Sequence, residues 1–263
     1  MRLFWEIAQR SIQRYLSYRA AALAGLSTNL FWGFLRAALM IALFAQQTEV
    51  AGMTVRDAVT YTAVTQAVIS YLSLFGWFDL MNSIYTGAVA TDLLKPISYY
   101  KLWLAQDLGR AFTQFLLRGV PLVVAYSFFY PITLPRALSQ WVGFLLAMLL
   151  GLLVSFSYRF LVNLSAFWVP NAIGIGRLGF FAALFLSGFI IPLRFMPDWF
   201  AGICWLTPFP HMITTIVEVY LGLLTGNQLL MSLGYQLLWF GALYLACLLV
   251  LRLGIRRLVI LGG

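Results

Sequence analysis

The sequence predicts an all-α integral membrane protein with six transmembrane helices, and three observations support that fold class. Hydrophobic residues make up 62% of the 263 residues and charged residues 10%, whereas a soluble domain is roughly 45–50% apolar and about 25% charged. Apolar stretches long enough to cross the ~30 Å hydrocarbon core as a helix recur along the chain. The basic residues gather on alternate connecting segments. No repeat or linker interrupts the pattern, so we expect one domain over residues 1–263.

The apolar stretches define the spans, and the charges define their orientation. We predict transmembrane helices at 20–45, 57–79, 108–130, 138–165, 172–192 and 229–252. An even number of spans places both termini on one side. With that side cytoplasmic, twelve of the 17 basic residues are internal: Arg2, Arg10, Arg14, Arg19, Lys95, Lys101, Arg110, Arg159, Arg177, Arg252, Arg256 and Arg257. The external segments hold three: Arg56, Arg136 and Arg194. The excess of internal basic residues predicts cytoplasmic N- and C-termini.

The first nineteen residues, 1–19, form a separate amphipathic element. Trp5, Ala8, Ile12 and Leu16 recur at helical spacing, and polar residues occupy the opposite face. This division predicts a helix that lies in the membrane interface. The alternative is a cytoplasmic helix packed on the bundle. The polar start does not resemble a cleavable signal peptide.

The connection before the last span is long and rich in proline. It begins IIPLRFMPDWF and carries a short apolar run from Met212 to Leu224. We expect a re-entrant or interfacial hairpin over Pro192–Leu224, because irregular backbone persists at membrane depth only where protein or water satisfies it. A seventh span would place the C-terminal arginines outside and contradict the charge rule.

Three charged residues are predicted at membrane depth. Arg36 lies within the first span, Arg118 within the third, and Glu218 within the predicted hairpin. A central arginine costs about 2.5–3.5 kcal/mol on insertion scales, so such residues tend to face a bundle interior or a wet cavity. We expect at least one arginine to face a central cavity, forming part of a pathway, or to pair with Glu218. The alternative is snorkelling to a lipid headgroup.

The segment 89–110, VATDLLKPISYYKLWLAQDLGR, gathers charges between spans two and three. Residues 83–94 are predicted to form a short helix that ends before Pro96, since the residue before a proline avoids the helical region. Asp107 and Arg110 then mark the entry of span three into the membrane. We interpret the helix as a docking element on the cytoplasmic side. The alternative is solvation combined with a charge that sets topology.

The sequence offers little for catalysis or for cofactor binding. GIGRLG at 174–179 matches G-x-G-x-x-G, but it opens a membrane segment and lacks the strand that a dinucleotide site requires. No phosphate-binding loop of the G-x-x-x-x-G-K-[ST] type is present. His211 is the only histidine, the carboxylates are scattered and the two cysteines suggest neither a disulfide framework nor a metal site. We therefore expect no catalytic residues, no metal and no cofactor on this chain. The net charge of +9 is attributed to membrane orientation, and no nucleic-acid partner is expected.

Taken together, several stretches give the chain a family resemblance along nearly its whole length. They include TDLLKPISYYKLWLAQDLGR, SGFIIPLRFMPDWF and LTPFPHMITTIVEVYLG. The chain resembles bacterial ABC-2-type transporter permeases of similar length. The resemblance implies six spans, an amphipathic connecting helix, a cytoplasmic coupling helix between spans two and three, and a re-entrant outer hairpin. It does not identify the cargo.

The same resemblance implies a set of partners and a mode of action. Two permease subunits pair, either as a homodimer or with a different ABC-2 permease, in the bacterial plasma (inner) membrane. Each engages a cytoplasmic ABC ATPase subunit, which carries the ATP and magnesium, so this chain would be a transport subunit without enzymatic activity. It would export an unidentified substrate, which could be amphipathic or lipid-like. The coupling helix maps on residues 83–95, with these expected ATPase contacts: Ser83, Tyr85, Thr86, Asp92, Leu93, Leu94 and Lys95.

Two other function classes compete with this interpretation. An ATP-independent channel or ion-coupled carrier would work without an ATPase and would usually show a charged relay along a span, which we do not find. An intramembrane enzyme needs a convergent nucleophile, acid, base or metal set. Co-purification with an ATPase favours the transporter permease, whereas activity of this polypeptide alone in reconstituted vesicles favours either competitor.

Overall fold

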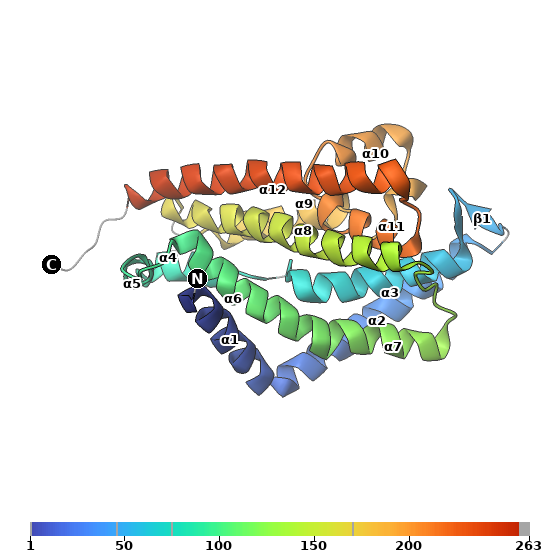
Figure 1. The fold of residues 1–263 in the computed structure, drawn as a ribbon, viewed down its shortest axis with the longest axis horizontal. Coiled ribbons are helices and arrows are strands. Elements are labelled where there is room, and N and C mark those ends of the chain that lie inside the picture. Colours follow the sequence, from blue (N-terminus) through green and yellow to red (C-terminus); the bar gives the residue numbers. More distant parts are fainter. Residues whose placement is uncertain (1, 46, 75, 170, 258–263) are drawn as a thin grey trace.

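The computed structural model of the protein describes residues 2–45, 47–74, 76–169 and 171–257, and these are mostly helical. The strands within these ranges form one small antiparallel hairpin, β1 (Glu49–Val50) and β2 (Met53–Thr54). Figure 1 shows the helices running largely along the long axis, with the β-hairpin at one end and two short helices, α4 (Asp79–Tyr85) and α5 (Val89–Leu93), at the other. The start of the first helix and the end of the last helix lie toward the α4–α5 end.

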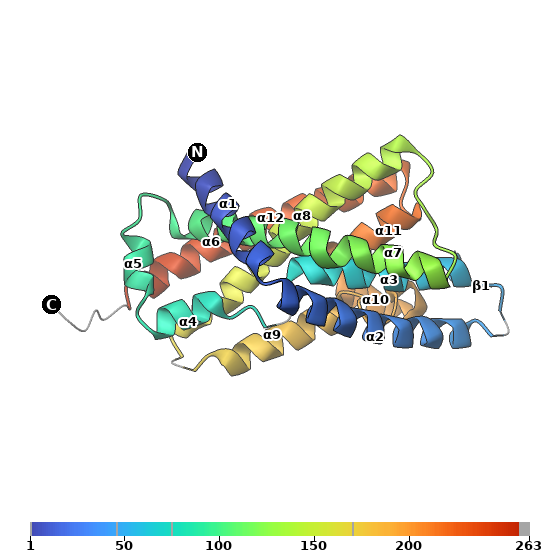
Figure 2. The same ribbon diagram turned by 90° about the horizontal axis from the view of Figure 1, so that it is seen from below.

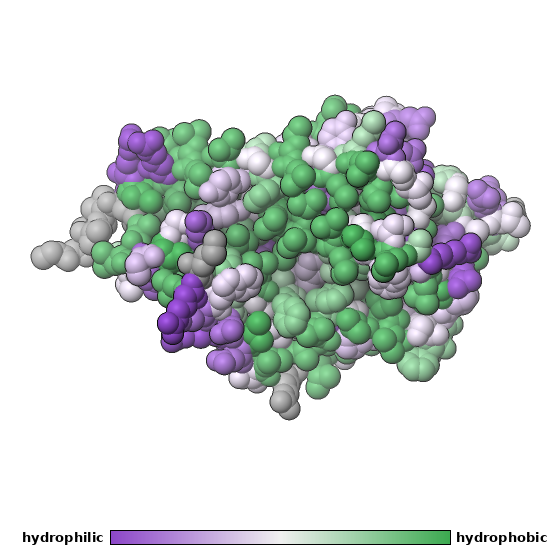
Figure 3. All heavy atoms as spheres, viewed as in Figure 1, coloured by the Kyte–Doolittle hydropathy of each residue, from purple (hydrophilic) through white to green (hydrophobic). Residues whose placement is uncertain are grey.

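Four helical runs in the described part of the chain are long and apolar enough to cross a membrane. The first is α2 (Arg19–Leu43). In the second, α6 (Tyr99–Gln114), the π-helix η1 (Phe115–Gly119) and α7 (Val120–Phe129) continue without a break. The third joins α8 (Leu138–Asn163) to η2 (Leu164–Phe167), and the fourth is α12 (Gly226–Ile255). Apolar atoms cover most of the visible face, and polar atoms gather mainly toward its two ends (Figure 3). This distribution fits a membrane-embedded protein.

The helix predicted at 57–79 is shorter than expected and lies in the protein core. It is α3 (Val55–Leu72), which begins with a capping box between Thr54 and Asp57. Every residue from Ala58 to Leu72 is buried. The helix ends at Leu72 because Ser73 adopts a left-handed conformation, which breaks the helical hydrogen-bond ladder. Residue 75 of the predicted span lies outside the described residues.

The helix predicted at 172–192 is also shorter than expected, since it ends before the chain reaches Pro192. It is α9 (Ile173–Leu186), with fourteen residues. The chain turns at Gly188, whose φ of +75° favours glycine, and Pro192 follows. By length, α9 does not reach across a 30 Å core as a straight helix. The two shortened helices, α3 and α9, are thus the elements that separate the predicted six spans from the four long apolar runs.

The predicted outer hairpin consists of several short helices. They are η3 (Leu193–Phe195), α10 (Asp198–Trp205), η4 (Pro210–Met212) and α11 (Thr214–Leu221). The α11 helix packs against α8 and α3, and its residues from Thr214 to Tyr220 are all buried. Most of the apolar run recognised in the sequence therefore belongs to the protein core.

The first helix, α1 (Arg2–Ser17), packs across α6. Ser11 Oγ donates a hydrogen bond to the Gln106 carbonyl at 2.7 Å, and Gly109 allows the backbone at Ala8 to approach closely. Trp5 remains 60% exposed on the same helix. The structure shows the predicted alternative, a helix packed on the bundle, and the position of α1 in the membrane interface stays a prediction.

Candidate functional site

The segment predicted as a docking element forms two short helices where the sequence predicted one. Gly87, with a φ of +76°, separates α4 from α5. A left-handed residue interrupts a right-handed helix, and glycine adopts that conformation at little cost. Asp92 Oδ1 accepts a hydrogen bond from Lys95 Nζ at 2.7 Å, and Ser83 Oγ lies 3.4 Å from the other carboxylate oxygen. These contacts fold the segment back on itself into a compact lobe.

The expected ATPase-contact residues divide into exposed and structural groups. Leu94 is 86% exposed, and Tyr85, Thr86 and Lys95 are also exposed. Ser83 is buried. The half-buried members of the set are Asp92 and Leu93. The exposed residues present a surface at one end of the molecule, whereas Ser83 and Asp92 hold the lobe together.

Asn163, at the end of α8, fixes this lobe to the bundle. Its Oδ1 accepts a hydrogen bond from the Met81 amide at 3.0 Å, within the first turn of α4. Its Nδ2 donates to the Trp77 carbonyl at 3.1 Å and to the Arg159 carbonyl at 2.8 Å. One buried amide therefore connects the backbone just before and within α4 to the backbone of α8.

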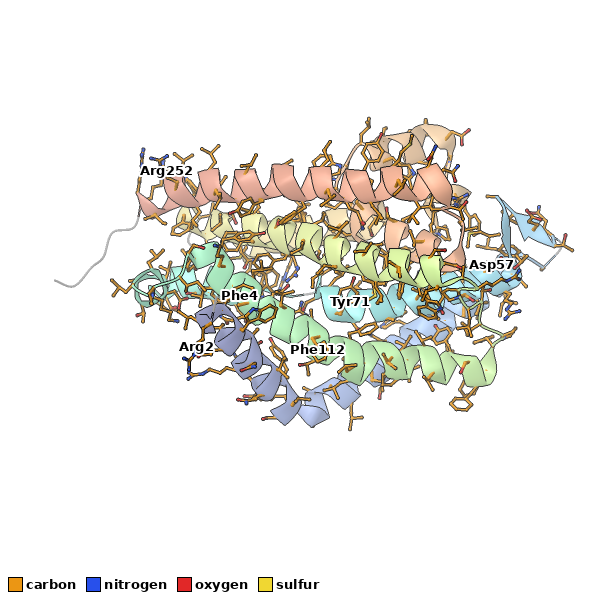
Figure 4. The ribbon with its side chains drawn as sticks, in the orientation of Figure 1. Arg2, Phe4, Asp57, Tyr71, Phe112 and Arg252 are labelled. Carbon is orange, nitrogen blue, oxygen red and sulfur yellow. The ribbon has the colours of Figure 1, made fainter. Side chains whose placement is uncertain are left out.

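An ion cluster continues from Arg159 into the bundle. Arg159 donates to both oxygens of Asp107, at 3.1 and 2.7 Å, and its guanidinium lies 4.9 Å from the centre of the Trp77 ring. Asp107 also pairs with Arg110, whose Nη2 donates to the Tyr71 carbonyl at 2.8 Å. All three charged side chains are at least 95% buried. In Figure 4, Tyr71 lies toward the middle of the molecule, with Arg2 and Arg252 toward one end and Asp57 at the other.

Asn163 and this ion cluster define a polar path from α4 through α8 and α6 to α3. A buried charge is stable only when it is paired and hydrogen-bonded, so these groups have few alternative arrangements. Movement of α4 would have to displace them or carry them along. The arrangement can transmit a displacement from the exposed lobe to three helices of the bundle.

The three charged residues predicted at membrane depth separate into two locations. Arg36 and Arg118 both line a cavity of about 860 Å³ between α2, α3, η1 and the segment after α9. Arg36 hydrogen-bonds to the Phe189 carbonyl and to Thr65 Oγ1 at 3.3 Å. Glu218 lines a different cavity and pairs with Arg194 at 2.6 Å. The predicted alternative of an Arg36 or Arg118 pair with Glu218 was therefore wrong, since Arg194 on η3 lies closer to that carboxylate.

Comparison with known families decides where the chain belongs. Residues 30–262 match the model of a family described as "ABC-2 family transporter protein". The chain is an ABC-2 family protein. The family match confirms the resemblance identified from the sequence, and it covers every described helix except α1 and the start of α2. Comparison with curated proteins gave no match.

In this ABC-2 protein, family membership indicates a permease component of an ABC transporter. The polar path was not recognised from the sequence, where Asp107, Arg110 and Arg159 were treated as charges that mark the inner membrane face. One signal was available: Arg159 lies inside the predicted span 138–165, six residues from its end, and charges within membrane spans are rare. Asn163 carried no comparable signal, because an amide near a helix end is common.

Proposed function

We propose that the chain is the membrane-spanning permease subunit of an ATP-binding-cassette exporter in the bacterial plasma membrane, with both termini cytoplasmic. Its energy would come from a separate ATPase, since the sequence contains no phosphate-binding loop. A second permease subunit, identical or different, would complete the pathway for an amphipathic or lipid-like substrate. The single observation that carries the proposal is the polar path that ties the exposed α4–α5 lobe to α8, α6 and α3.

The mechanism follows from this connection. ATP binding closes the ATPase subunits and displaces the α4–α5 lobe docked on them. Asn163 holds the backbone on both sides of Phe78, so the displacement reaches α8. Asp107 of α6 pairs with Arg159 of α8, and Arg110 of α6 continues the connection to α3 through the Tyr71 carbonyl. Packed helices shift between discrete arrangements and do not deform continuously, so the bundle alternates between two states. The substrate contributes only its difference in affinity for those states.

The proposal is tested by co-purification of the tagged chain from its native host with an ABC ATPase subunit. Leu94→Asp introduces a charge at the most exposed apolar position of the lobe and should weaken ATPase association by about tenfold or more. Leu134→Asp is the matched control, because Leu134 is also exposed but follows α7, far from the lobe. Association that survives Leu94→Asp unchanged would contradict docking at this lobe. Transport by this polypeptide alone in reconstituted vesicles would favour a channel or an ion-coupled carrier.

A further inference from the structure

The cavity lined by Arg36 and Arg118 combines two charges with apolar walls. Trp32, Leu35 and Leu39 contribute apolar surface from α2, and Gln66 contributes an amide from α3. Both arginines belong to helical runs that are long and apolar enough to span the membrane. At about 860 Å³, the cavity falls within the size range of sites for small organic ligands.

Neither arginine has a counter-charge within the described part of the chain. The ion pairs found there involve other residues, and no aspartate or glutamate lines the cavity. Arg36 donates only to neutral acceptors, the Thr65 hydroxyl and the Phe189 carbonyl. The Nε atoms of Arg36 and Arg118 are both buried without a hydrogen-bond partner. The Arg36 guanidinium also lies 4.4 Å from the centre of the Phe189 ring. Two guanidinium groups without a carboxylate partner among the described residues favour the binding of an anion.

The local backbone holds Arg118 in this position. Arg118 lies on η1, a π-helical turn, and such turns occur frequently at functional sites. Pro121 lies two residues after this turn and lacks the backbone amide that would donate a hydrogen bond in a regular α-helix. The guanidinium lies against Gly25 of α2, where an added Cβ would come within 2.5 Å of Arg118 Cζ. The side chain thus rests on a neighbouring helix.

We propose that this cavity binds an acidic amphiphile, whose phosphate, sulfate or carboxylate headgroup contacts Arg36 and Arg118 and whose alkyl or aryl part lies against the apolar wall. Guanidinium groups form strong, charge-assisted hydrogen bonds with such oxyanions. The inference rests on the proposed permease function and names the chemical class of its substrate. An anionic membrane lipid shares this chemistry and is the other source of such a ligand.

The test measures binding to the purified chain in phosphatidylcholine nanodiscs, without ATPase and without ATP. Three probes share a twelve-carbon chain: dodecyl phosphate, dodecyl maltoside and dodecyltrimethylammonium. The signal is the fluorescence of Trp32, defined as the part that is lost in Trp32→Phe. This signal should saturate as dodecyl phosphate is added. The affinity for each of the other two probes should be at least tenfold weaker. Equal responses to the phosphate and the ammonium probe would overturn the proposal.

Variants assign the response to the two arginines. Arg118→Gln should weaken dodecyl phosphate binding by about tenfold or more, and Arg118→Lys should retain part of it. Arg136→Gln removes an exposed arginine outside the cavity and should leave binding unchanged. Because Arg36 also binds the Phe189 carbonyl, Arg36→Gln is interpreted only when its thermal unfolding matches the parent. Unchanged binding in Arg118→Gln would overturn the proposal.

Two further arms identify the occupant. Phosphatidylglycerol in the nanodiscs should compete with dodecyl phosphate if the natural ligand is a membrane lipid. It should not compete if the ligand is a distinct cargo. Both results agree with the proposal. If Arg118→Gln abolished the pairing of permease subunits but left probe binding unchanged, Arg118 would pair with a carboxylate of the second subunit. That result would overturn the proposal. Because no ATPase is present, failure here leaves the coupling tests of the proposed function unaffected.

Discussion

Arg159 of α8 and Asp107 of α6 form a two-pronged ion pair, with nitrogen–oxygen distances of 3.1 and 2.7 Å, inside the helical bundle. The aspartate is fully buried and the arginine is 5% exposed. Arg110 adds a second positive charge to the same carboxylate. Asp107 is therefore the shared counter-ion of two buried cations.

Replacement of this counter-ion should strongly destabilise the protein. Asp107→Asn keeps the side-chain shape but leaves Arg110 and Arg159 without a negative charge, and breaking a buried pair in this way costs about 3–5 kcal/mol. Denaturant unfolding in detergent, followed by tryptophan fluorescence, measures the change. The matched control is Asp198→Asn at the start of α10, where the residue is exposed, and we expect a change below about 0.5 kcal/mol. A loss below about 1 kcal/mol in Asp107→Asn would show that the cluster is not held by charge.

The amide of Asn163 should matter for coupling more than for assembly. Asn163→Ala removes the hydrogen bonds to Met81 and Trp77 but leaves the exposed face of the lobe intact. We expect the ATPase to remain bound while the stimulation of its hydrolysis by the permease falls severalfold. The measurement is ATP hydrolysis by the purified complex. Asn227→Ala, at an exposed position of α12, serves as control. If Asn163→Ala retained full stimulation, the polar path would not be the route of coupling.

The contact between α1 and α6 depends on the absence of a side chain at Gly109. A Cβ at this position would overlap the Ala8 carbonyl and approach Ser11 Cβ to 2.7 Å. Gly109→Ala should therefore destabilise the protein by about 1–3 kcal/mol, as overpacking typically does. Gly234→Ala is the comparison, because an added Cβ there meets nothing within 4 Å and should be neutral or stabilising. Thermal unfolding of both variants decides the matter, and equal melting temperatures would contradict the packing described for α1.

The sequence predicted the long apolar helices well and the short elements less well. Hydropathy locates α2, α8 and α12 because each contains a long apolar stretch with few charged residues. It overextended α3 and α9, whose ends are set by Ser73 and Gly188 in left-handed conformations that hydropathy does not sense. In both helices, a residue with positive φ marks the end of the helix, and the amino-acid composition does not reveal that end.

The site was predictable only in part, for a related reason. Charge at membrane depth pointed to Arg36 and Arg118, and the structure places both at one cavity. Pairing could not be predicted, since Glu218 meets Arg194 through the fold of the outer hairpin. The Asp107–Arg159 pair joins residues 52 positions apart, and no local pattern specifies such a contact.

The central claim is that a cytoplasmic α4–α5 lobe transmits ATPase movement to a membrane-embedded bundle, and site-directed labelling tests it most directly. Thr86→Cys and Thr48→Cys place single exposed thiols at the lobe and beside the β-hairpin, in a background where the buried Cys204 and Cys247 are replaced by serine and alanine. A membrane-impermeant maleimide applied to intact cells should label Thr48→Cys and leave Thr86→Cys unmodified until the cells are opened. Labelling of Thr86→Cys in intact cells would contradict the account.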